Sequence, residues 1–274
     1  MGKEASLIDI AVHQARKQEK MTTETLVNTQ FKSDKENFYM RHHKIQSFAS
    51  ASEKRDQYKA RILGPATVWD RLMALAHVND ESDAELEGMT QLGHALQTAN
   101  AIANDGQDEN WIIVGLIHDL GKIMQAAGEK PEFTVGDVYP VGCQFGRSIV
   151  YYDYLQENPD WNHPVYSTKN GIYEPECGLM NVTMSYGHDE YIYQIFKDLL
   201  PYEMLWTLRH HSFQSVASDY THLMTKEDKE LRETHMRKFM GYDLYTKDKY
   251  NVGGHKLKYY QEIIERRYPE PINW

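Results

Sequence analysis

The residues with the clearest capacity for chemistry are an adjacent histidine and aspartate, His118 and Asp119, in the segment GLIHDLGK. Leu116, Ile117 and Leu120 flank the pair, so we expect both side chains to be buried. A buried carboxylate and a buried imidazole lose hydration free energy unless they are paired or bind a metal. The pair therefore predicts either a His–Asp hydrogen bond or a metal site, with the second carboxylate oxygen free for another metal.

Two later segments offer further imidazoles. His188 and Asp189 repeat the doublet after a glycine in SYGHDEY, although Asp189 and Glu190 would also stabilise a helix N-terminus without any metal. In TLRHHSF, His211 continues the apolar stripe of a predicted helix, whereas His210 points about 100° away. His211 is therefore the better inward-facing candidate.

His94 and Asp243 are the remaining candidate ligands. Asp243 follows a predicted helix end, in GYDLYTK. Periodicity places His94 on a polar face beside an apolar stripe, which predicts an exposed side chain, although such a face also suits a polar cavity. The other histidines are expected to be solvated (His13, His42, His43, His163, His255) or to have structural or surface roles (His77, His222, His235).

Lys122 follows Asp119 by three residues and His118 by four, so all three share one face of a predicted helix. An ammonium in that position suits a hydrogen bond to the alkoxide of a metal-bound substrate. The alternative is an ordinary lysine at a helix end that reaches the surface.

The elements that must position these residues are predicted to be helices, which makes the fold all-α. Helical periodicity is weak over 35–60 and clearer in six later segments: 66–83, ending in an acidic turn; 89–104; 109–128, capped by Asp108 and ended by Gly128; 188–209, with a new start at Pro201; 225–241, opened by a Thr225–Asp228 capping box; and 256–268. We find no alternating strand pattern of useful length.

Residues 129–187 contain many prolines, glycines and aromatic residues without sustained periodicity. Long loops of this kind are usually functional or disordered, and the aromatic residues argue against disorder. We expect ordered loops and short helices that cover the site. Residues 1–33 are polar and predict an N-terminal arm before a single domain over 34–274.

Composition restricts the class of protein. The chain has 274 residues and a net charge of −10, which is unfavourable for binding nucleic acid or an anionic membrane. It contains no apolar stretch long enough to cross a bilayer and begins without a signal-peptide core. With only two cysteines, it is expected to be cytoplasmic.

The order His94, His118-Asp119, Asp243 is similar to the metal-binding pattern of the HD-domain superfamily. The chain more closely resembles the myo-inositol oxygenases, and the resemblance extends from about residue 65 to the C-terminus. It rests on NDESD, GHALQTAN, WIIVGLIHDLGK, VGDVYPVGC, ENPDWNHPVYSTKNGIYEPECGL, MSYGHDEYIYQ, RHHSF, DYTHLM and DLYTK.

The resemblance implies an HD-type helical fold and two iron ions, a mixed-valent Fe(II)/Fe(III) pair, with Asp119 as the bridging ligand. One iron would be bound by His94, His118 and Asp243, and the other by His188 and His211. The set of nitrogen and oxygen ligands without cysteine suits iron better than structural zinc.

The resemblance further implies cleavage of the C1–C6 bond of myo-inositol by dioxygen to give D-glucuronate, by a monomeric enzyme. Asp119 and Lys122 would have catalytic roles. The implied substrate contacts also include His211, the acidic turn Asp80, Glu81 and Ser82, and the later residues Gly136, Asp137 and Ser212.

The sequence departs from the family pattern at two places, neither of which is a candidate metal ligand. Tyr186 replaces a tryptophan that is frequent in the family, and Phe31-Lys32 replaces a Phe-Arg whose arginine helps to close over the substrate. Lysine retains the charge but lacks the planar fork of arginine.

Two other functions remain as alternatives. An HD-type metal-dependent phosphohydrolase would need phosphate-binding cations, for which the segments offer mainly Lys122 and Arg209. A non-enzymatic di-iron protein that binds or senses oxygen would need a dry pocket.

Overall fold

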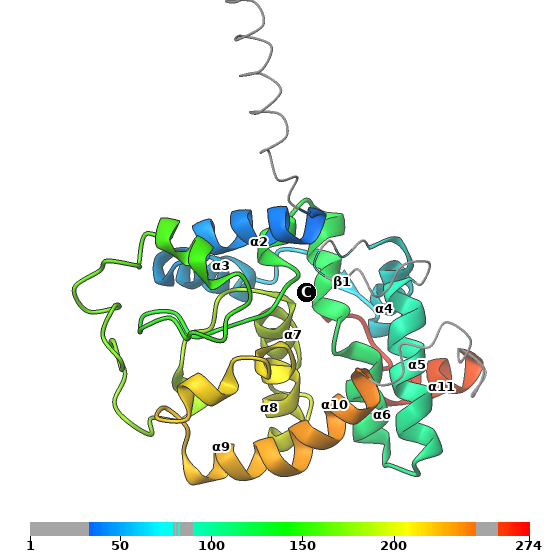
Figure 1. The fold of residues 1–274 in the computed structure, drawn as a ribbon. Helices are drawn as coiled ribbons and strands as arrows, with labels where there is room; N and C mark the ends of the chain where they lie inside the picture. The colour runs from blue at the N-terminus through cyan, green and yellow to red at the C-terminus, as the bar shows by residue number, and fades with distance from the viewer. Residues whose placement is uncertain (1–32, 79, 81, 83–89, 245–256) are drawn as a thin grey trace, which may run out of the picture. The chain divides into compact units, whose positions relative to one another are not determined.

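The computed structural model describes residues 33–78, 80, 82, 90–244 and 257–274. Lys35–Trp274 form one compact, mostly helical unit (Figure 1), which confirms the all-α class. The boundary between an arm at 1–33 and a domain at 34–274 stays a prediction. The α-helices are α2 (Asp34–Ile45), α3 (Phe48–Lys59), α4 (Val68–Ala74), α5 (Gln91–Asn104), α6 (Glu109–Ile117), α7 (His188–Phe196), α8 (Tyr202–His210), α9 (Lys226–Leu231), α10 (Arg237–Asp243) and α11 (Leu257–Arg267).

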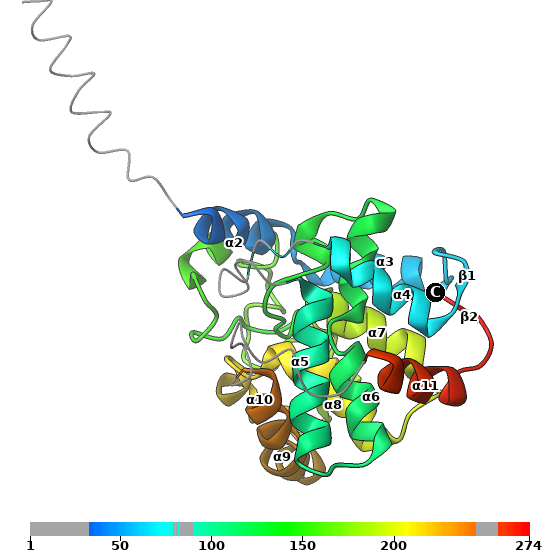
Figure 2. The ribbon, with the colours of Figure 1, turned by 90° about the vertical axis from the view of Figure 1, so that its right-hand side faces the viewer.

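Two pairs of helices form the centre of this unit. Helix α5 packs along α6, and α7 packs along α8, while α10 contacts both α5 and α6 (Figure 2). Two short strands, β1 (Pro65–Ala66) and β2 (Ile272–Asn273), pair antiparallel near the C-terminus. No helix among the described residues is long and apolar enough to cross a membrane.

The predicted helix over 109–128 is wrong in its second half. Asp108 caps α6 as expected, but α6 ends at Ile117, and a 3-10 helix (Leu120–Ala127) follows and ends at Gly128. A side chain at Gly121 would lie 2.3 Å from the carbonyl oxygen of His188, so the glycine permits a close approach to α7. The change of helix type therefore accompanies tight packing at the His118-Asp119 pair.

The segment after α8 also departs from a single regular helix. The predicted capping box of Thr225 and Asp228 is present at the start of α9. A π-helical turn (Arg232–Met236) then separates α9 from α10, which ends at Asp243. Local widening of this kind is rare and is often found near functional sites.

Residues 129–187 fold as turns and short 3-10 helices, as predicted, including Pro131–Phe133, Tyr152–Glu157 and Leu179–Asn181. The expectation that His42 and His43 are solvated is wrong, because both are buried. His43 Nε2 lies 2.7 Å from the Val150 carbonyl oxygen, and its Nδ1 lies 3.2 Å from the Tyr139 hydroxyl. Both partners belong to the 129–187 segment, and the periodicity of α2 alone gives no sign that this segment covers His42 and His43.

Among the other histidines, His77 is exposed, and three are partly exposed (His163, His222, His235). His13 and His255 lie outside the described residues.

Candidate metal centre

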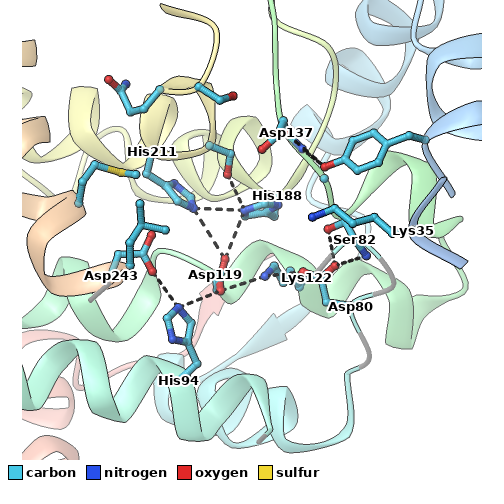
Figure 3. A pocket seen from close by; sticks show the side chains of 17 residues that line it. Lys35, Asp80, Ser82, His94, Asp119, Lys122, Asp137, His188, His211 and Asp243 are labelled. Atoms are coloured by element: carbon cyan, nitrogen blue, oxygen red, sulfur yellow. Dashed lines mark hydrogen bonds and ion pairs between the residues drawn. The ribbon is translucent and has the colours of Figure 1, made fainter. Parts of the chain in front are cut away.

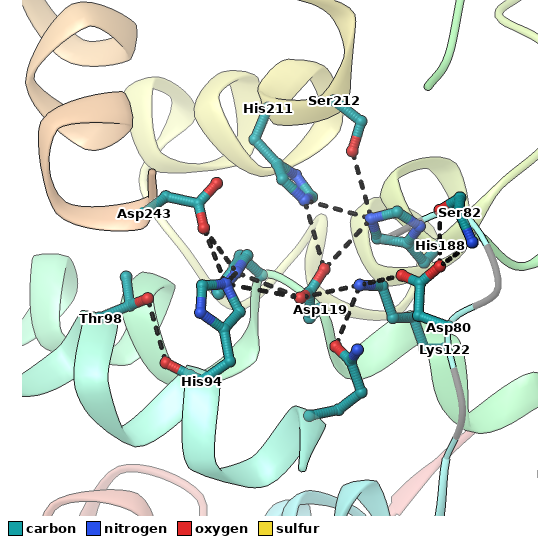
Figure 4. A network of polar contacts seen from close by, with 12 residues as sticks. Asp80, Ser82, His94, Thr98, Asp119, Lys122, His188, His211, Ser212 and Asp243 are labelled. Atoms are coloured by element: carbon teal, nitrogen blue, oxygen red, sulfur yellow. Dashed lines mark hydrogen bonds and ion pairs between the residues drawn. The ribbon is translucent and has the colours of Figure 1, made fainter. Parts of the chain in front are cut away.

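Two groups of three side chains face one another where α5, α6, α7, α8 and α10 meet (Figure 4). One group is His94, His118 and Asp243, and the other is Asp119, His188 and His211. All six residues are buried. Each group therefore contains two imidazoles and one carboxylate, a set of ligands that suits a transition-metal ion such as iron.

Asp119 lies between the two groups and faces both. Its Oδ2 is 3.4 Å from His118 Nε2 and 3.8 Å from His94 Nε2, whereas its Oδ1 is 3.3 Å from His188 Nε2 and 3.7 Å from His211 Nε2. This geometry gives each group one oxygen of the same carboxylate. Asp119 can thus join two metal ions.

The tautomers of three histidines follow from their backbone partners. The Nδ1 atoms of His118, His188 and His211 each lie within hydrogen-bond distance of a main-chain carbonyl oxygen. These oxygens belong to Gly115, Thr134 and Leu208, at 2.9, 2.9 and 2.8 Å. A carbonyl only accepts hydrogen bonds, so Nδ1 carries the proton and the Nε2 lone pair of the neutral ring is available as a ligand.

The Nε2 atoms of His188 and His211 are 3.2 Å apart, and those of His118 and His94 are 3.3 Å apart. The tautomers assigned to His188 and His211 direct two Nε2 lone pairs at one another, and these repel at this distance unless a cation lies between them. Ligand atoms on one ion at about 2.1 Å, roughly at right angles, are about 3 Å apart. The donor atoms therefore fit two bound metal ions.

Nearby charges decide the protonation of the centre. Burial lowers the pKa of His118, but the carboxylates of Asp119 and Asp243 outweigh this effect and raise its pKa to about 10. Without an ion, His118 therefore also holds a proton on Nε2, which a bound metal ion would displace. Burial would raise the pKa of Asp119, but Lys122 and His118 hold it well below its usual value. The carboxylate is therefore ionised and available as a ligand.

Lys122 is buried beside the centre, and its ammonium donates to three groups. The acceptors are Asp80 Oδ2 at 2.7 Å, Asp119 Oδ2 at 3.0 Å and Gln91 Oε1 at 3.0 Å. Burial disfavours its charge, but Asp119 and Asp80 outweigh this effect and raise the pKa of Lys122. Because a 3-10 turn spaces residues i and i+3 on one face, the predicted alignment of Lys122 with Asp119 survives the change of helix type.

A cavity of about 510 Å³ opens beside the centre (Figure 3). Its lining includes seven of the predicted substrate contacts: Asp80, Ser82, Lys122, Gly136, Asp137, His211 and Ser212. The other two, Lys32 and Glu81, lie outside the described residues. Gly136 has φ +90°, which favours glycine and lets the main chain bend at the cavity wall.

His94 and His210 are both buried, but only His94 lines the cavity. His94 is buried and lines the cavity, so the prediction of an exposed side chain is wrong and the polar-cavity interpretation is confirmed. His210 is buried too, but its Nδ1 lies 2.8 Å from the Trp206 carbonyl oxygen within α8, and burial lowers its pKa to about 3. His211 is the histidine of this doublet that lines the cavity.

Sequence reasoning missed several residues of the cavity wall. Tyr39 donates a hydrogen bond to Asp137 Oδ2 at 3.2 Å, and Lys35 lines the cavity nearby. Gln91 holds Lys122 from the first turn of α5. Tyr39 and Lys35 are four residues apart on α2, a spacing that places them on one face, but nothing in the sequence pointed that face toward the metal centre.

Comparison with known proteins agrees with this geometry. The sequence model of the myo-inositol oxygenase family matches residues 32–274. The chain belongs to the myo-inositol oxygenase family. Inositol oxygenase 5 of Arabidopsis thaliana is 41% identical over 261 residues, which is 91% of this chain and 82% of the relative. Inositol oxygenase of Mus musculus is 39% identical over 240 residues, or 85% and 84% of the two chains.

Membership of this family makes the chain an oxygenase, a metal-binding enzyme of inositol catabolism. The phosphohydrolase alternative is not favoured. The two cations on which it would depend are engaged elsewhere: Lys122 with carboxylates, and Arg209 with Glu190 at 2.7 Å.

Proposed function

We propose that this chain cleaves the C1–C6 bond of myo-inositol with one dioxygen, giving D-glucuronate and water, at two iron ions. The observation that carries the proposal is the pair of two-histidine, one-aspartate triads beside a polar cavity. The names of the relatives in plants, Dictyostelium discoideum and mouse support the substrate.

Six side chains would hold the ions. His94, His118 and Asp243 would bind one, His188 and His211 would bind the other, and Asp119 would bridge them. When bound, a mixed-valent Fe(II)/Fe(III) pair supplies the one-electron redox chemistry that dioxygen activation requires.

The cavity wall would bind the inositol hydroxyl groups. Asp80 and Asp137 offer carboxylate acceptors, Ser212 offers a hydroxyl, and Gly136 exposes main-chain groups. Such groups suit a neutral polyol, which provides several donors and acceptors but no charge. We assign Glu81 and Lys32 to the same surface, as the family resemblance implies.

Lys122 would exchange one of its three present hydrogen bonds for a hydroxyl oxygen of inositol and would stabilise negative charge on that oxygen. Its ammonium is buried and close to the carboxylate that would bridge the ions. Asp80 and Gln91 hold it in place, and Ser82 in turn donates to Asp80 Oδ1 through its main-chain N–H at 2.9 Å. The lysine is therefore oriented before substrate enters.

We further infer a cytoplasmic location, which the two free cysteines Cys143 and Cys177 support. As the family resemblance implies, the working unit would be a monomer.

The test is dioxygen uptake by iron-loaded protein with and without myo-inositol, together with measurement of D-glucuronate. We expect uptake that depends on inositol, with one glucuronate formed for each dioxygen consumed. Oxygen binding without turnover would indicate an oxygen carrier or sensor, and release of phosphate from a phosphoester would indicate a hydrolase. Either result would contradict the proposal.

A further inference from the structure

Asp189 is the second residue of α7 and follows the ligand candidate His188 directly. It is only 1% exposed, yet it is absent from both triads and from the cavity lining. Its place in the first turn suggested a helix N-terminal role, but the polar atoms nearest its Oδ2 belong to His211 and Ser212, which directly follow α8. Asp189 Oδ2 accepts from the Ser212 N–H at 3.0 Å and lies 3.2 Å from His211 Nδ1. The Nδ1–H of His211, which also lies 2.8 Å from the Leu208 carbonyl oxygen, is shared between that oxygen and Asp189.

The other oxygen of Asp189 faces the metal centre. Oδ1 lies 3.0 Å from Nε2 of His188, the nitrogen whose lone pair is available as a metal ligand. Within the described part of the chain, no group donates a hydrogen bond to this oxygen. A buried carboxylate with one unpaired oxygen is costly, and a nearby cation compensates that cost.

Among the described residues, no carboxylate lies beside the Nδ1 atom of either histidine of the first triad (His94, His118 and Asp243). His118 Nδ1 has only the Gly115 carbonyl oxygen, and His94 Nδ1 has no hydrogen-bond partner among residues 33–78, 80, 82, 90–244 and 257–274. A carboxylate that accepts from the outer nitrogen of a ligating histidine fixes the ring and makes it a stronger ligand. The two triads therefore differ in their support.

We propose that Asp189 is a positioning residue for the second metal ion alone. Through Oδ2 it holds the His211 ring and the Ser212 main chain, and through Oδ1 it places negative charge beside His188. This inference rests on the proposed function in so far as the Asp119, His188 and His211 triad binds an ion.

The experiment measures metal affinity, not turnover, in variants that isolate each site. Removing Asp243 leaves the second site, and removing His211 leaves the first. Metal-free protein carrying Asp243→Ala or His211→Ala is titrated anaerobically with Co(II) alone, with and without Asp189→Asn. We expect Asp189→Asn to weaken Co(II) binding about 10- to 100-fold at the second site and to leave the first site unchanged.

Asp228→Asn is the matched control, because Asp228 is another buried aspartate that accepts hydrogen bonds from a ring and from the main chain. Its partners are Trp206 Nε1 at 2.7 Å and Leu179 N at 3.0 Å. We expect this variant to unfold at a lower temperature without losing Co(II) affinity at either site. If Asp189→Asn does not fold, Asp189→Glu retains the charge and should weaken the second site only.

A second measurement needs no metal. In metal-free protein labelled with ¹⁵N-histidine, Asp189→Asn should shift the Nδ1–H resonance of His211 and leave that of His118 in place. Equal Co(II) affinity with and without Asp189, or equal loss at both sites, would overturn the inference. If the protein without substitutions binds fewer than two Co(II) ions, the proposed function is contradicted instead. The histidine spectrum still tests the positioning role in that case, because it needs no metal.

Discussion

The side of the site that holds the six ligand candidates (the metal side) and the remaining wall of the cavity (the wall) are built differently. The six ligand candidates lie within helices or directly at their ends, and all are buried against the core. The wall is formed mostly by turns and loop residues, such as Ser82, Gly136 and Asp137, with Lys122 at the junction of the two. Its side chains contact water-accessible space as well as protein.

This difference has a physical reason. A carboxylate or imidazole in the core is tolerated only with a counter-charge, so each ligand depends on the others. A wall residue borders the cavity and belongs to neither triad, so its removal leaves the pairing among the six ligand candidates in place. Changes on the metal side should therefore remove ions, whereas changes on the wall should alter substrate binding and leave the ions in place.

The largest effect is expected at Asp119, because both triads use it. Asp119→Ala should lose most of both irons and essentially all activity, measured as iron per chain in purified protein. The control Asp153→Ala removes an exposed aspartate and should retain about two irons. An Asp119→Ala protein that still holds both ions would show that the triads do not share this carboxylate.

The next largest effect is expected from replacing Lys122, which contacts Asp119 on the metal side and also lines the cavity. Lys122→Ala deletes a charge-assisted hydrogen bond worth about 1.5–3 kcal/mol, so turnover should fall at least ten-fold while both irons remain. Lys197→Ala, at an exposed lysine, is the control and should change neither quantity. Loss of iron would make Lys122 part of the metal side, and near-normal turnover would make it an ordinary lysine.

The sequence singled out the six residues that the structure brings together in the two triads, and it did so for a definite reason. Polar doublets such as His118-Asp119 stand out in an apolar helix because burial without a partner is costly. His94 gave two interpretations, since a polar helix face looks the same whether it meets bulk water or a polar cavity. Only packing against α6 and α10 distinguishes them.

The wall and some helix ends were harder to predict. The break after Ile117 coincides with a close approach of Gly121 to the main chain of His188, which lies 67 residues later in the numbering. His42 and His43 are buried by partners far along the chain. Periodicity describes one helix at a time and contains no information on such partners.

Asp137 is the clearest test of the wall. Its Oδ2 accepts from Tyr39, and burial raises the pKa of its carboxyl group while Lys35 opposes this rise. Asp137→Ala should weaken inositol binding about 2- to 10-fold, the effect of one lost hydrogen bond of about 0.5–1.5 kcal/mol, with iron content unchanged. Unchanged inositol affinity would mean that the 136–137 turn does not contact the substrate.

The smallest effect is expected from replacing Lys32 or Lys35. The resemblance predicts that Lys32 takes the role of the family's closing arginine, which stays a prediction because Lys32 lies outside the described residues. Lys35, on the first turn of α2, does line the cavity. A solvent-accessible cation such as Lys35 contributes little to binding free energy. Removing whichever of the two lysines contacts the substrate should therefore raise the inositol requirement only about two- to five-fold.

Inositol titrations of Lys32→Ala and Lys35→Ala, with iron content as the control, decide between the two. If Lys32 closes over the substrate, Lys32→Ala should raise the requirement and Lys32→Arg should not, because arginine retains the charge. A rise with Lys35→Ala alone would assign that role to α2 instead. Equal activity in wild type and Lys32→Ala would contradict the family-based assignment. Removing either lysine should leave both irons bound, because neither belongs to a triad and an ammonium group supplies no ligand. This separation of substrate binding from metal binding is what distinguishes the wall from the metal side.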